Sequence, residues 1–439
     1  GLFSTTTGNY NTSVGQGSVQ LNTTGSNNTG LGQAALGSNT TASDNTAVGK
    51  SALAANTTGT RNVAVGTYAL DANTTASYNT AVGNNALTAN TTGQVNTAVG
   101  DNCLDANTTA SYVTGVGCNA LTSNTTGTRN TAVGYNSMAA NTVGGDNTAF
   151  GEAALEDNTS GIRSTALGRA ALASVNGNSN RHVAIGYAAL VSLTGGNENI
   201  AIGNEAGQSM TIADANTLIG SYCGDALTTG YYNTAVGRAA LSSCVTGIGN
   251  VAVGWKALDQ STSGYCVGIG HEALVSNTSG QYNVAVGKGA LHDITTNNMC
   301  TAVGHEALYN NESAGVTAVG FYAGYSNTTG YLTAMGRNSC RNNTTGDQNT
   351  AFGDNTSYSN TDGINNTAVG VNALYSNNGG DNNTAVGRYA NMLLTTANAN
   401  TSIGSMAGYH TTTGSGNINL GGTPSTATAS YQITLGTTS

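Results

Sequence analysis

Residues 45–61 read Asn-Thr-Ala-Val-Gly-Lys-Ser-Ala-Leu-Ala-Ala-Asn-Thr-Thr-Gly-Thr-Arg, and close variants of this stretch follow one another along the chain of 439 residues. The glycine that ends Asn-Thr-Ala-Val-Gly marks each copy, and these marker glycines run from Gly15 to Gly436. There are 26 of them, and 20 of the 25 intervals between them have the same length as the interval from Gly32 to Gly49. A short repeat that covers a whole chain is typical of solenoids, in which each copy forms one coil and packs only against its neighbours.

A short β-strand is expected just before each marker glycine. In all 26 copies the residue one before the glycine is bulky and apolar, as Val48 is, and the residue three before it is β-branched, as Thr46 is. The residue between these two is Ala, Gly or Ser in 23 copies. The exceptions are Leu218, Asn419 and Thr434. Side chains two residues apart share one face of a strand, and β-branched residues favour strands.

The remainder of each copy predicts a second short strand and two turns. Four residues after the marker glycine, 17 copies carry Leu, Met or Val, as at Leu53 and Leu70. Runs such as Asn56-Thr57-Thr58-Gly59 follow and are typical of turns. The prediction is therefore an all-β protein, a parallel β-solenoid (β-roll) of about 26 coils with a 17-residue period. It forms one continuous shaft over residues 1–421, followed by an irregular terminal coil over 422–439.

The three strand positions predict which side chains fill the core of the coil and which contact another chain. We expect the bulky columns to fill the core of the roll, and the residues concerned are Val48, Val65, Val82, Val99, Leu53 and Leu70. A persistently small side chain implies that another backbone approaches closely, because a position facing water would also accept Lys or Glu. This predicts a chain–chain interface of a homotrimer at Ala47, Ala64, Ala81, Ala98 and Ala132. The alternative is a monomer whose strand simply prefers Ala.

Composition excludes several classes of protein. Charged residues make up 8% of the chain, the net charge is −9, and the only proline is Pro424. An acidic chain with few cations does not favour nucleic acid, and no apolar run approaches the roughly 20 residues of a membrane-spanning helix.

An asparagine stands four residues before the marker glycine in many copies, as at Asn45 and Asn62. This column of asparagines predicts amide ladders between coils.

Residues with catalytic or metal-binding potential are sparse. The seven cysteines form no Cys-x-x-Cys pair, which favours small buried thiols; they are Cys103, Cys118, Cys223, Cys244, Cys266, Cys300 and Cys340. The pairs at 271–272 and 305–306 read His-Glu, but the second histidine of a zinc-protease helix is absent in both. We therefore expect no enzymatic activity, no cofactor and no metal. Asn-x-Thr triplets such as 56–58 match glycosylation acceptors.

The repeat resembles that of a known family. The segments Asn62–Gly66, His182–Gly186 and Asn199–Gly203 are similar to the Ser-Val-Ala-Ile-Gly core of YadA-like head repeats in trimeric autotransporter adhesins. The usual repeat of that family is shorter, so the coil of this chain departs from the pattern. The longer unit, Asn-Thr-Ala-Val-Gly-x-x-Ala-Leu-x-x-Asn-Thr-Thr-Gly, looks more like phage tail-fibre proteins. Residues 431–439 resemble the end of such a shaft before a self-cleaving chaperone. The resemblance implies a homotrimeric roll.

The leading functional hypothesis is therefore the shaft of a phage tail fibre involved in host attachment, located in the virion or outside a cell. The head of a bacterial trimeric surface adhesin is the first alternative, and an ice-binding β-solenoid is the second. The partners expected are two further copies of the chain and a host surface glycan or protein, with no nucleic acid and no membrane insertion. Tyrosines such as Tyr68, Tyr78, Tyr112 and Tyr135 are candidates for contact with sugars.

Overall fold

The structure is a computed structural model that describes residues 4–177, 179–422 and 427–436. Over these ranges it consists of 26 short β-strands joined by turns and contains no helix, so none of the described residues forms a helix able to cross a membrane. The chain divides into two compact units, Gly1–Ser221 and Tyr222–Ser439.

The first unit contains thirteen strands: β1 (Thr12–Val14), β2 (Thr29–Leu31), β3 (Thr46–Val48), β4 (Val63–Val65), β5 (Thr80–Val82), β6 (Thr97–Val99), β7 (Thr114–Val116), β8 (Thr131–Val133), β9 (Thr148–Phe150), β10 (Thr165–Leu167), β11 (Val183–Ile185), β12 (Ile200–Ile202) and β13 (Thr217–Ile219). The second unit contains the other thirteen: β14 (Thr234–Val236), β15 (Val251–Val253), β16 (Val267–Ile269), β17 (Val284–Val286), β18 (Thr301–Val303), β19 (Thr317–Val319), β20 (Leu332–Met335), β21 (Asn349–Phe352), β22 (Thr367–Val369), β23 (Thr384–Val386), β24 (Thr401–Ile403), β25 (Ile418–Leu420) and β26 (Ile433–Leu435).

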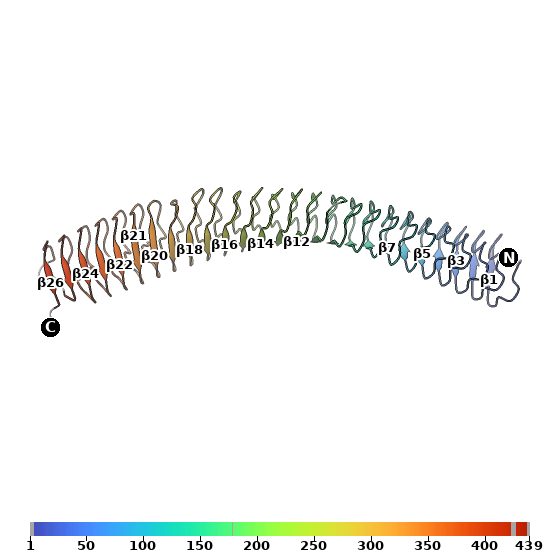
Figure 1. Cartoon of the computed structure of the whole chain (residues 1–439), viewed down its shortest axis with the longest axis horizontal. Coiled ribbons are helices and arrows are strands. Elements are labelled where there is room, and N and C mark those ends of the chain that lie inside the picture. Colours follow the sequence, from blue (N-terminus) through green and yellow to red (C-terminus); the bar gives the residue numbers. More distant parts are fainter. Residues whose placement is uncertain (1–3, 178, 423–426, 437–439) are drawn as a thin grey trace. The chain divides into compact units, whose positions relative to one another are not determined.

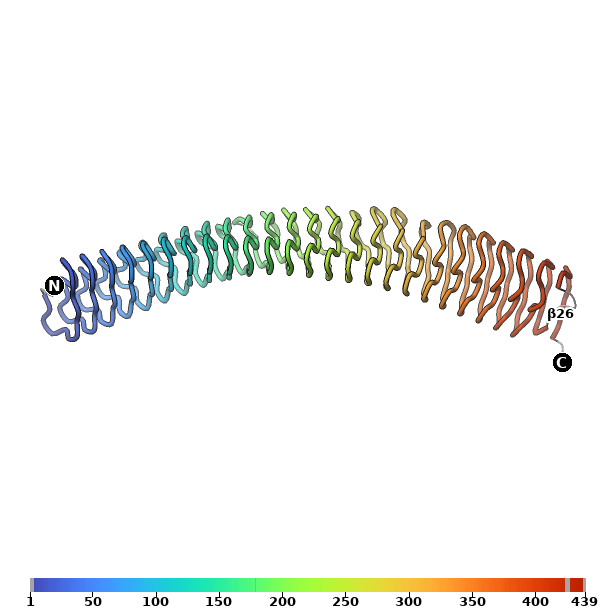
Figure 2. Tube along the Cα trace, turned by 180° about the vertical axis from the view of Figure 1, so that it is seen from behind, coloured from blue at the N-terminus to red at the C-terminus, as the bar shows by residue number. Residues whose placement is uncertain are grey.

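Within each unit the strands stack in sequence order, one strand per coil (Figures 1 and 2). Each strand pairs in parallel with the next, and the register follows the repeat: Thr46 lies opposite Val63, and Val48 opposite Val65. The same offset of one repeat holds in the second unit, where Thr367 lies opposite Thr384. The predicted parallel β-solenoid with a 17-residue period is confirmed.

The two faces of the strand are the reverse of the predicted ones. Ala47 is fully buried inside its own coil, whereas Thr46 and Val48 on either side of it are half-buried and point outward. The same holds for the other alanines predicted as an interface, Ala64, Ala81, Ala98 and Ala132, all of which are fully buried within one chain. An alanine enclosed by its own coil cannot contact another chain, so this interface prediction was wrong.

The predicted core was therefore right at two of its six residues. Leu53 and Leu70 are fully buried, but Val48, Val65, Val82 and Val99 lie on the outside of the coil and are only half-buried. The core is filled mainly by two columns that face each other, the alanines of the strands and the Ala-Leu pairs of the opposite arm. One cluster of the core also includes two residues of the turn, Leu394 and Ala397, and its other members are Ala368, Ala373, Leu374, Ala385 and Ala390.

The opposite arm of the coil is a series of turns, so the predicted second strand is absent there. Leu53 has φ +52°, and Ser51 two residues earlier has φ +56°. These left-handed backbone angles at alternate residues cannot belong to a β-strand. The arm is still held by its neighbours, because the Leu53 N–H donates to the Ala69 carbonyl of the next coil at 3.0 Å.

The distance between the two arms explains the small residue at the centre of each strand. A Cβ added at Gly115 would lie 2.6 Å from the Cys103 Sγ and 3.4 Å from the Leu104 side chain, both on the facing arm. Where the strand carries Leu218 instead, the facing leucine is replaced by Gly207, whose added Cβ would lie 3.0 Å from Leu218. In this coil a large residue on the strand is matched by a small residue on the facing arm, as close packing requires.

The marker glycine is required by the stacking of coils. Gly49 has φ +136°, and a Cβ added there would lie 2.3 Å from the Gly66 carbonyl oxygen of the next coil. No side chain fits in that space, so the coil needs glycine at this point.

Asparagine side chains connect successive coils, as predicted. The Asn45 Oδ1 accepts the Asn62 N–H at 2.9 Å, and the Asn45 Nδ2 donates to the Gly59 carbonyl at 2.9 Å. On the turn side, Asn56 donates to the Asn39 Oδ1 at 3.0 Å. All these asparagines are fully buried, so the ladders satisfy backbone groups that would otherwise be buried without partners.

The predicted terminal coil over 422–439 lies partly outside the described residues, which omit 423–426 and 437–439. Between them, β26 pairs in parallel with β25, and Ile433 lies opposite Ile418.

Candidate functional site

The outward face of the strands is the most distinctive surface of the chain. It consists of the residues one and three before each marker glycine, such as Thr46 and Val48, and they are repeated on every strand. None of these residues is charged in any of the 26 copies. A water-facing strand surface would normally carry charged or long polar side chains at some of these positions.

Several side chains of the outward face expose a large apolar area. Phe150 is 52% exposed, Leu31 45% and Ile403 47%. In the first unit the stripe includes Val14, Leu31, Val63, Phe150, Leu167 and Ile200, and in the second it includes Ile269, Met335, Phe352, Val369, Ile403, Ile418 and Leu420. An extended exposed apolar stripe marks an interaction surface.

The wrongly placed valines belong to this face and lie together. Val48, Val65, Val82 and Val99 come from four consecutive strands and lie opposite one another in register. The sequence contained a signal that could have placed them correctly. Leu218 and Asn419, two of the large residues in the alanine column, each have a glycine eleven positions earlier, Gly207 and Gly408, where most coils carry leucine. This exchange shows that the alanine column faces the leucine column.

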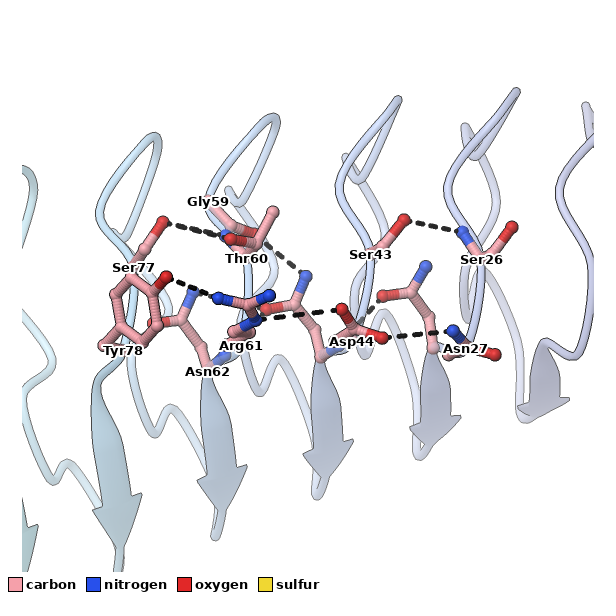
Figure 3. Close-up of polar contacts among 12 residues, drawn as sticks. Ser26, Asn27, Ser43, Asp44, Gly59, Thr60, Arg61, Asn62, Ser77 and Tyr78 are labelled. Atoms are coloured by element: carbon pink, nitrogen blue, oxygen red, sulfur yellow. Dashed lines mark hydrogen bonds and ion pairs between the residues drawn. The ribbon is translucent and has the colours of Figure 1, made fainter.

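A second surface runs along the edge where the chain enters each strand. The edge column consists of the residues five before the marker glycines, and in Figure 3 it is seen at Asn27, Asp44, Arg61 and Tyr78. Asn27 donates to Asp44 at 3.1 Å, and the Arg61 guanidinium lies 4.0 Å from the Asp44 carboxylate and donates to the Tyr78 hydroxyl at 2.5 Å. Exposed pairs of this kind contribute little stability, so the edge column is free to vary.

The hydroxyls beside the edge column have a structural role. The Ser26 N–H donates to the Ser43 Oγ, and the Thr60 N–H donates to the Ser77 Oγ, both at 3.0 Å (Figure 3). These bonds satisfy backbone groups at the turn.

The Asn-x-Thr triplets of the turn, such as the one at 56–58, bury their asparagine side chains, whereas Asn27, Asn365 and Asn382 in the edge column begin triplets of the same kind and are exposed. Asn56 is fully buried and donates to the Gly59 carbonyl at 3.0 Å as well as to Asn39. Asn73, Asn90, Asn107 and Asn124 are buried in the same way. A side chain held inside the folded coil is inaccessible, so the triplets of the turn are ladder elements of the fold.

The second unit carries an aromatic row that the sequence analysis did not identify. It consists of residues five after the marker glycines, and its members are His292, Tyr309, Tyr325, Arg341, Tyr358 and Tyr375. His292 stacks on Tyr309 with ring centroids 4.5 Å apart, and Tyr358 stacks on Tyr375 at 5.1 Å. In the first unit the corresponding positions hold no aromatic residue, so the coil does not need these rings to fold.

The cysteines behave as buried thiols. All except the exposed Cys118 are buried, and none of the seven forms a disulfide. Burial raises the pKa of the Cys103 and Cys340 thiols to about 12 and that of Cys244 to about 11. Thiolate is the reactive form of cysteine, so these three are poor nucleophiles.

The histidine–glutamate pairs lie on the surface beside the aromatic row. The His271 Nδ1 is 3.4 Å from a Glu272 oxygen, and the His305 Nε2 is 3.7 Å from a Glu306 oxygen. Within the described ranges no group of three or more His, Cys, Asp or Glu side chains is arranged to hold a metal ion.

Comparison of the chain with protein-family models gave no match, and comparison with curated proteins gave none either.

Proposed function

We propose that the chain is the shaft of an extracellular attachment fibre built from three copies, most closely akin to a phage tail fibre, and that it acts as a structural protein with no enzymatic activity. The observation that carries the proposal is the uncharged outward face, which recurs on every strand. The resemblance of the repeat to trimeric adhesins and tail fibres supports the same conclusion. A bacterial adhesin head is the alternative within this class.

A further copy of the chain is the partner that this face fits. The face repeats once per coil, so a surface with the same period matches it along each unit, and another copy of the chain has that period. Association would remove the exposed parts of side chains such as Phe150 and Leu31 from water, at about 25 cal/mol for each Å². Three copies around one axis would direct every outward face inward, in a closed symmetric assembly.

The mass in solution is the first test. Light scattering should give three times the chain mass of 43.6 kDa, and the value should not change on dilution. A chain that stays monomeric at all concentrations would refute the assembly.

Cross-linking tests which face is used. In a Cys118→Ser background, Val82→Cys should give covalent dimers with a short bis-maleimide, because equivalent outward residues of different copies meet at the axis. The matched control is Gln94→Cys, which is exposed at the turn and should give none. Dimers from Gln94→Cys alone would place the interface elsewhere.

Ice binding is the second candidate, because the same face carries a threonine column beside an aliphatic column. Thr46 and Val48 both point outward, and Ala47 between them points inward. This function requires the outward face to meet water. A monomeric chain with measurable thermal hysteresis would favour it, and a trimer without hysteresis would exclude it.

A further inference from the structure

Two consecutive coils of the second unit depart from the repeat. The marker glycines Gly304, Gly320 and Gly336 follow one another at intervals that are one position shorter than in most coils. Over the same coils the buried asparagine before the strand is replaced by Val316 and Leu332. Most coils follow one pattern, and a place where the local rules are broken is a candidate for a functional site.

One aromatic ring in the shortened coils is uncovered. The edge column of this unit contains Tyr265 and Tyr282, whose rings stack with centroids 5.7 Å apart. Further along the column, Gly315 precedes Tyr331, so no side chain extends over the Tyr331 ring from that coil. Tyr331 is 61% exposed, and within the described ranges no other ring stacks on it.

Hollows lie beside this ring. One, of about 260 Å³, is lined by Gly315, Tyr331, Leu332, Thr333, Gln348, Asn349 and Thr350. Another, of about 160 Å³, is lined by Ser313, Ala314, Gly330 and Tyr331. Both are smaller than the roughly 300–1,000 Å³ of pockets for drug-sized ligands, so each accommodates about one small ring.

The polar groups around the larger hollow are held in place. The Asp347 Oδ1 accepts the Tyr331 N–H at 2.6 Å and the Gln348 N–H at 2.9 Å. This carboxylate therefore fixes the backbone on both sides of the hollow, and the exposed Gln348 side chain supplies an amide with both donors and an acceptor. Among the residues that the structure describes, no Lys or Arg lines the hollow.

We propose that the larger hollow binds one neutral hexopyranose unit of a glycan. The apolar C–H face of the sugar would lie on the Tyr331 ring, and its hydroxyls would bond to the Gln348 amide. A phosphate-bearing or nucleotide ligand is disfavoured, because no Lys or Arg among the described residues lines the site. The Asp347 carboxylate beside the site would also repel a negatively charged ligand. The inference does not rest on the proposed assembly, because Tyr331 and Gln348 belong to the edge column and not to the outward face that the assembly would cover.

Saturation-transfer NMR on the full chain tests the site, with the methyl β-glycosides of glucose, galactose and N-acetylglucosamine as probes. Two variants remove the site in different ways. Tyr331→Ala removes the ring on which the sugar would lie. Gly315→Tyr fills the hollow with the residue found elsewhere in the column, and the backbone accepts it, because Gly315 has φ +69° and Tyr282 has φ +59°. The new Cβ would lie 3.6 Å from the Tyr331 ring, an ordinary contact.

The wild-type chain should transfer saturation to at least one glycoside, and both variants should bind it at least about tenfold more weakly, which corresponds to about 1.4 kcal/mol. Tyr282→Ala is the matched control and should bind as the wild type does. Absence of transfer to all three glycosides would overturn the proposal, and so would binding that survives in Gly315→Tyr. An equal loss in Tyr282→Ala would overturn it as well, because it would show that exposed tyrosines bind sugars without a site. Gly315→Tyr decides the matter if Tyr331→Ala fails to fold.

Discussion

A single buried histidine should make the stability of the first unit depend on pH. His182 occupies the place that asparagine holds in most coils and is fully buried. Its Nδ1 accepts the Asn199 N–H at 3.3 Å, and its Nε2 lies 2.6 Å from the Ser179 Oγ. Because the Ser179 hydroxyl donates to the Gly196 carbonyl at 2.8 Å, its oxygen is left to accept from Nε2–H. The ring is therefore neutral, and protonation of Nδ1 would break the bond to Asn199.

Burial lowers the pKa of His182 from 6.5 to about 4, although the Gly196 carbonyl and the Asp214 carboxylate act in the opposite direction. Above pH 6.5 neither the folded nor the unfolded chain carries the proton. Between pH 6.5 and 4 the unfolded chain takes it up first, so the free energy of unfolding falls as the pH falls and levels off below about pH 4. The difference between the pKa of 6.5 in the unfolded chain and about 4 in the folded chain corresponds to about 3 kcal/mol of unfolding free energy.

The variant His182→Asn provides the comparison, because asparagine restores the regular ladder. Its Oδ1 would accept the Asn199 N–H, as the Asn45 Oδ1 accepts the Asn62 N–H. Urea unfolding of both proteins between pH 7.5 and 4 should show the wild type losing about 3 kcal/mol relative to the variant. Hydrogen exchange of peptides around Asn199 should show where the loss occurs. Identical pH profiles for the two proteins would refute the assignment of a buried neutral imidazole.

Four further substitutions test the packing and stacking of the coil. Ala98→Leu should destabilise the fold by about 1–3 kcal/mol through overpacking, and Leu87→Gly on the facing arm should cost about 2–5 kcal/mol. In a double-mutant cycle of urea unfolding, the double variant should lose less unfolding free energy than the two single variants added together, by about 2 kcal/mol or more. Strict additivity would contradict the conclusion that the two columns face each other. Asn79→Ala should lower the free energy of unfolding by about 1–3 kcal/mol. The Asn79 Oδ1 accepts the Asn96 N–H at 3.0 Å, and the substitution leaves this N–H buried without a partner. An unchanged urea midpoint would show that water replaces the amide. Gly83→Ala should prevent correct stacking, since its Cβ would lie 2.2 Å from the Gly100 carbonyl oxygen, and a soluble variant with native circular dichroism and an unchanged melting temperature would contradict this.

The repeat itself made the fold predictable. A fixed period with a β-branched residue and an apolar residue two apart requires one strand per coil, and stacked equivalent coils require parallel pairing in register, as Thr46 and Val63 show. The asparagine ladders followed from the same reasoning. The second strand was predicted incorrectly because an apolar column was taken to imply a strand. Leu53 is buried from a turn with left-handed backbone angles, and its hydrophobicity carries no information about those angles.

The inside and outside of the strand were reversed for a different physical reason. Hydrophobicity suggests that Val48 is buried and leaves Ala47 for a partner chain, but so short a coil is too thin for two large side chains to meet at its centre. The facing arm already supplies leucine, so the strand can supply only a methyl group, and the larger valines are forced outward. Leu218 on the strand, paired with Gly207 on the facing arm, shows that the coil has room for only one large side chain there. The exposed apolar stripe is thus a direct consequence of the narrow coil: a chain that closes its own core with alanine carries its valines on the surface, where the copies we propose would cover them.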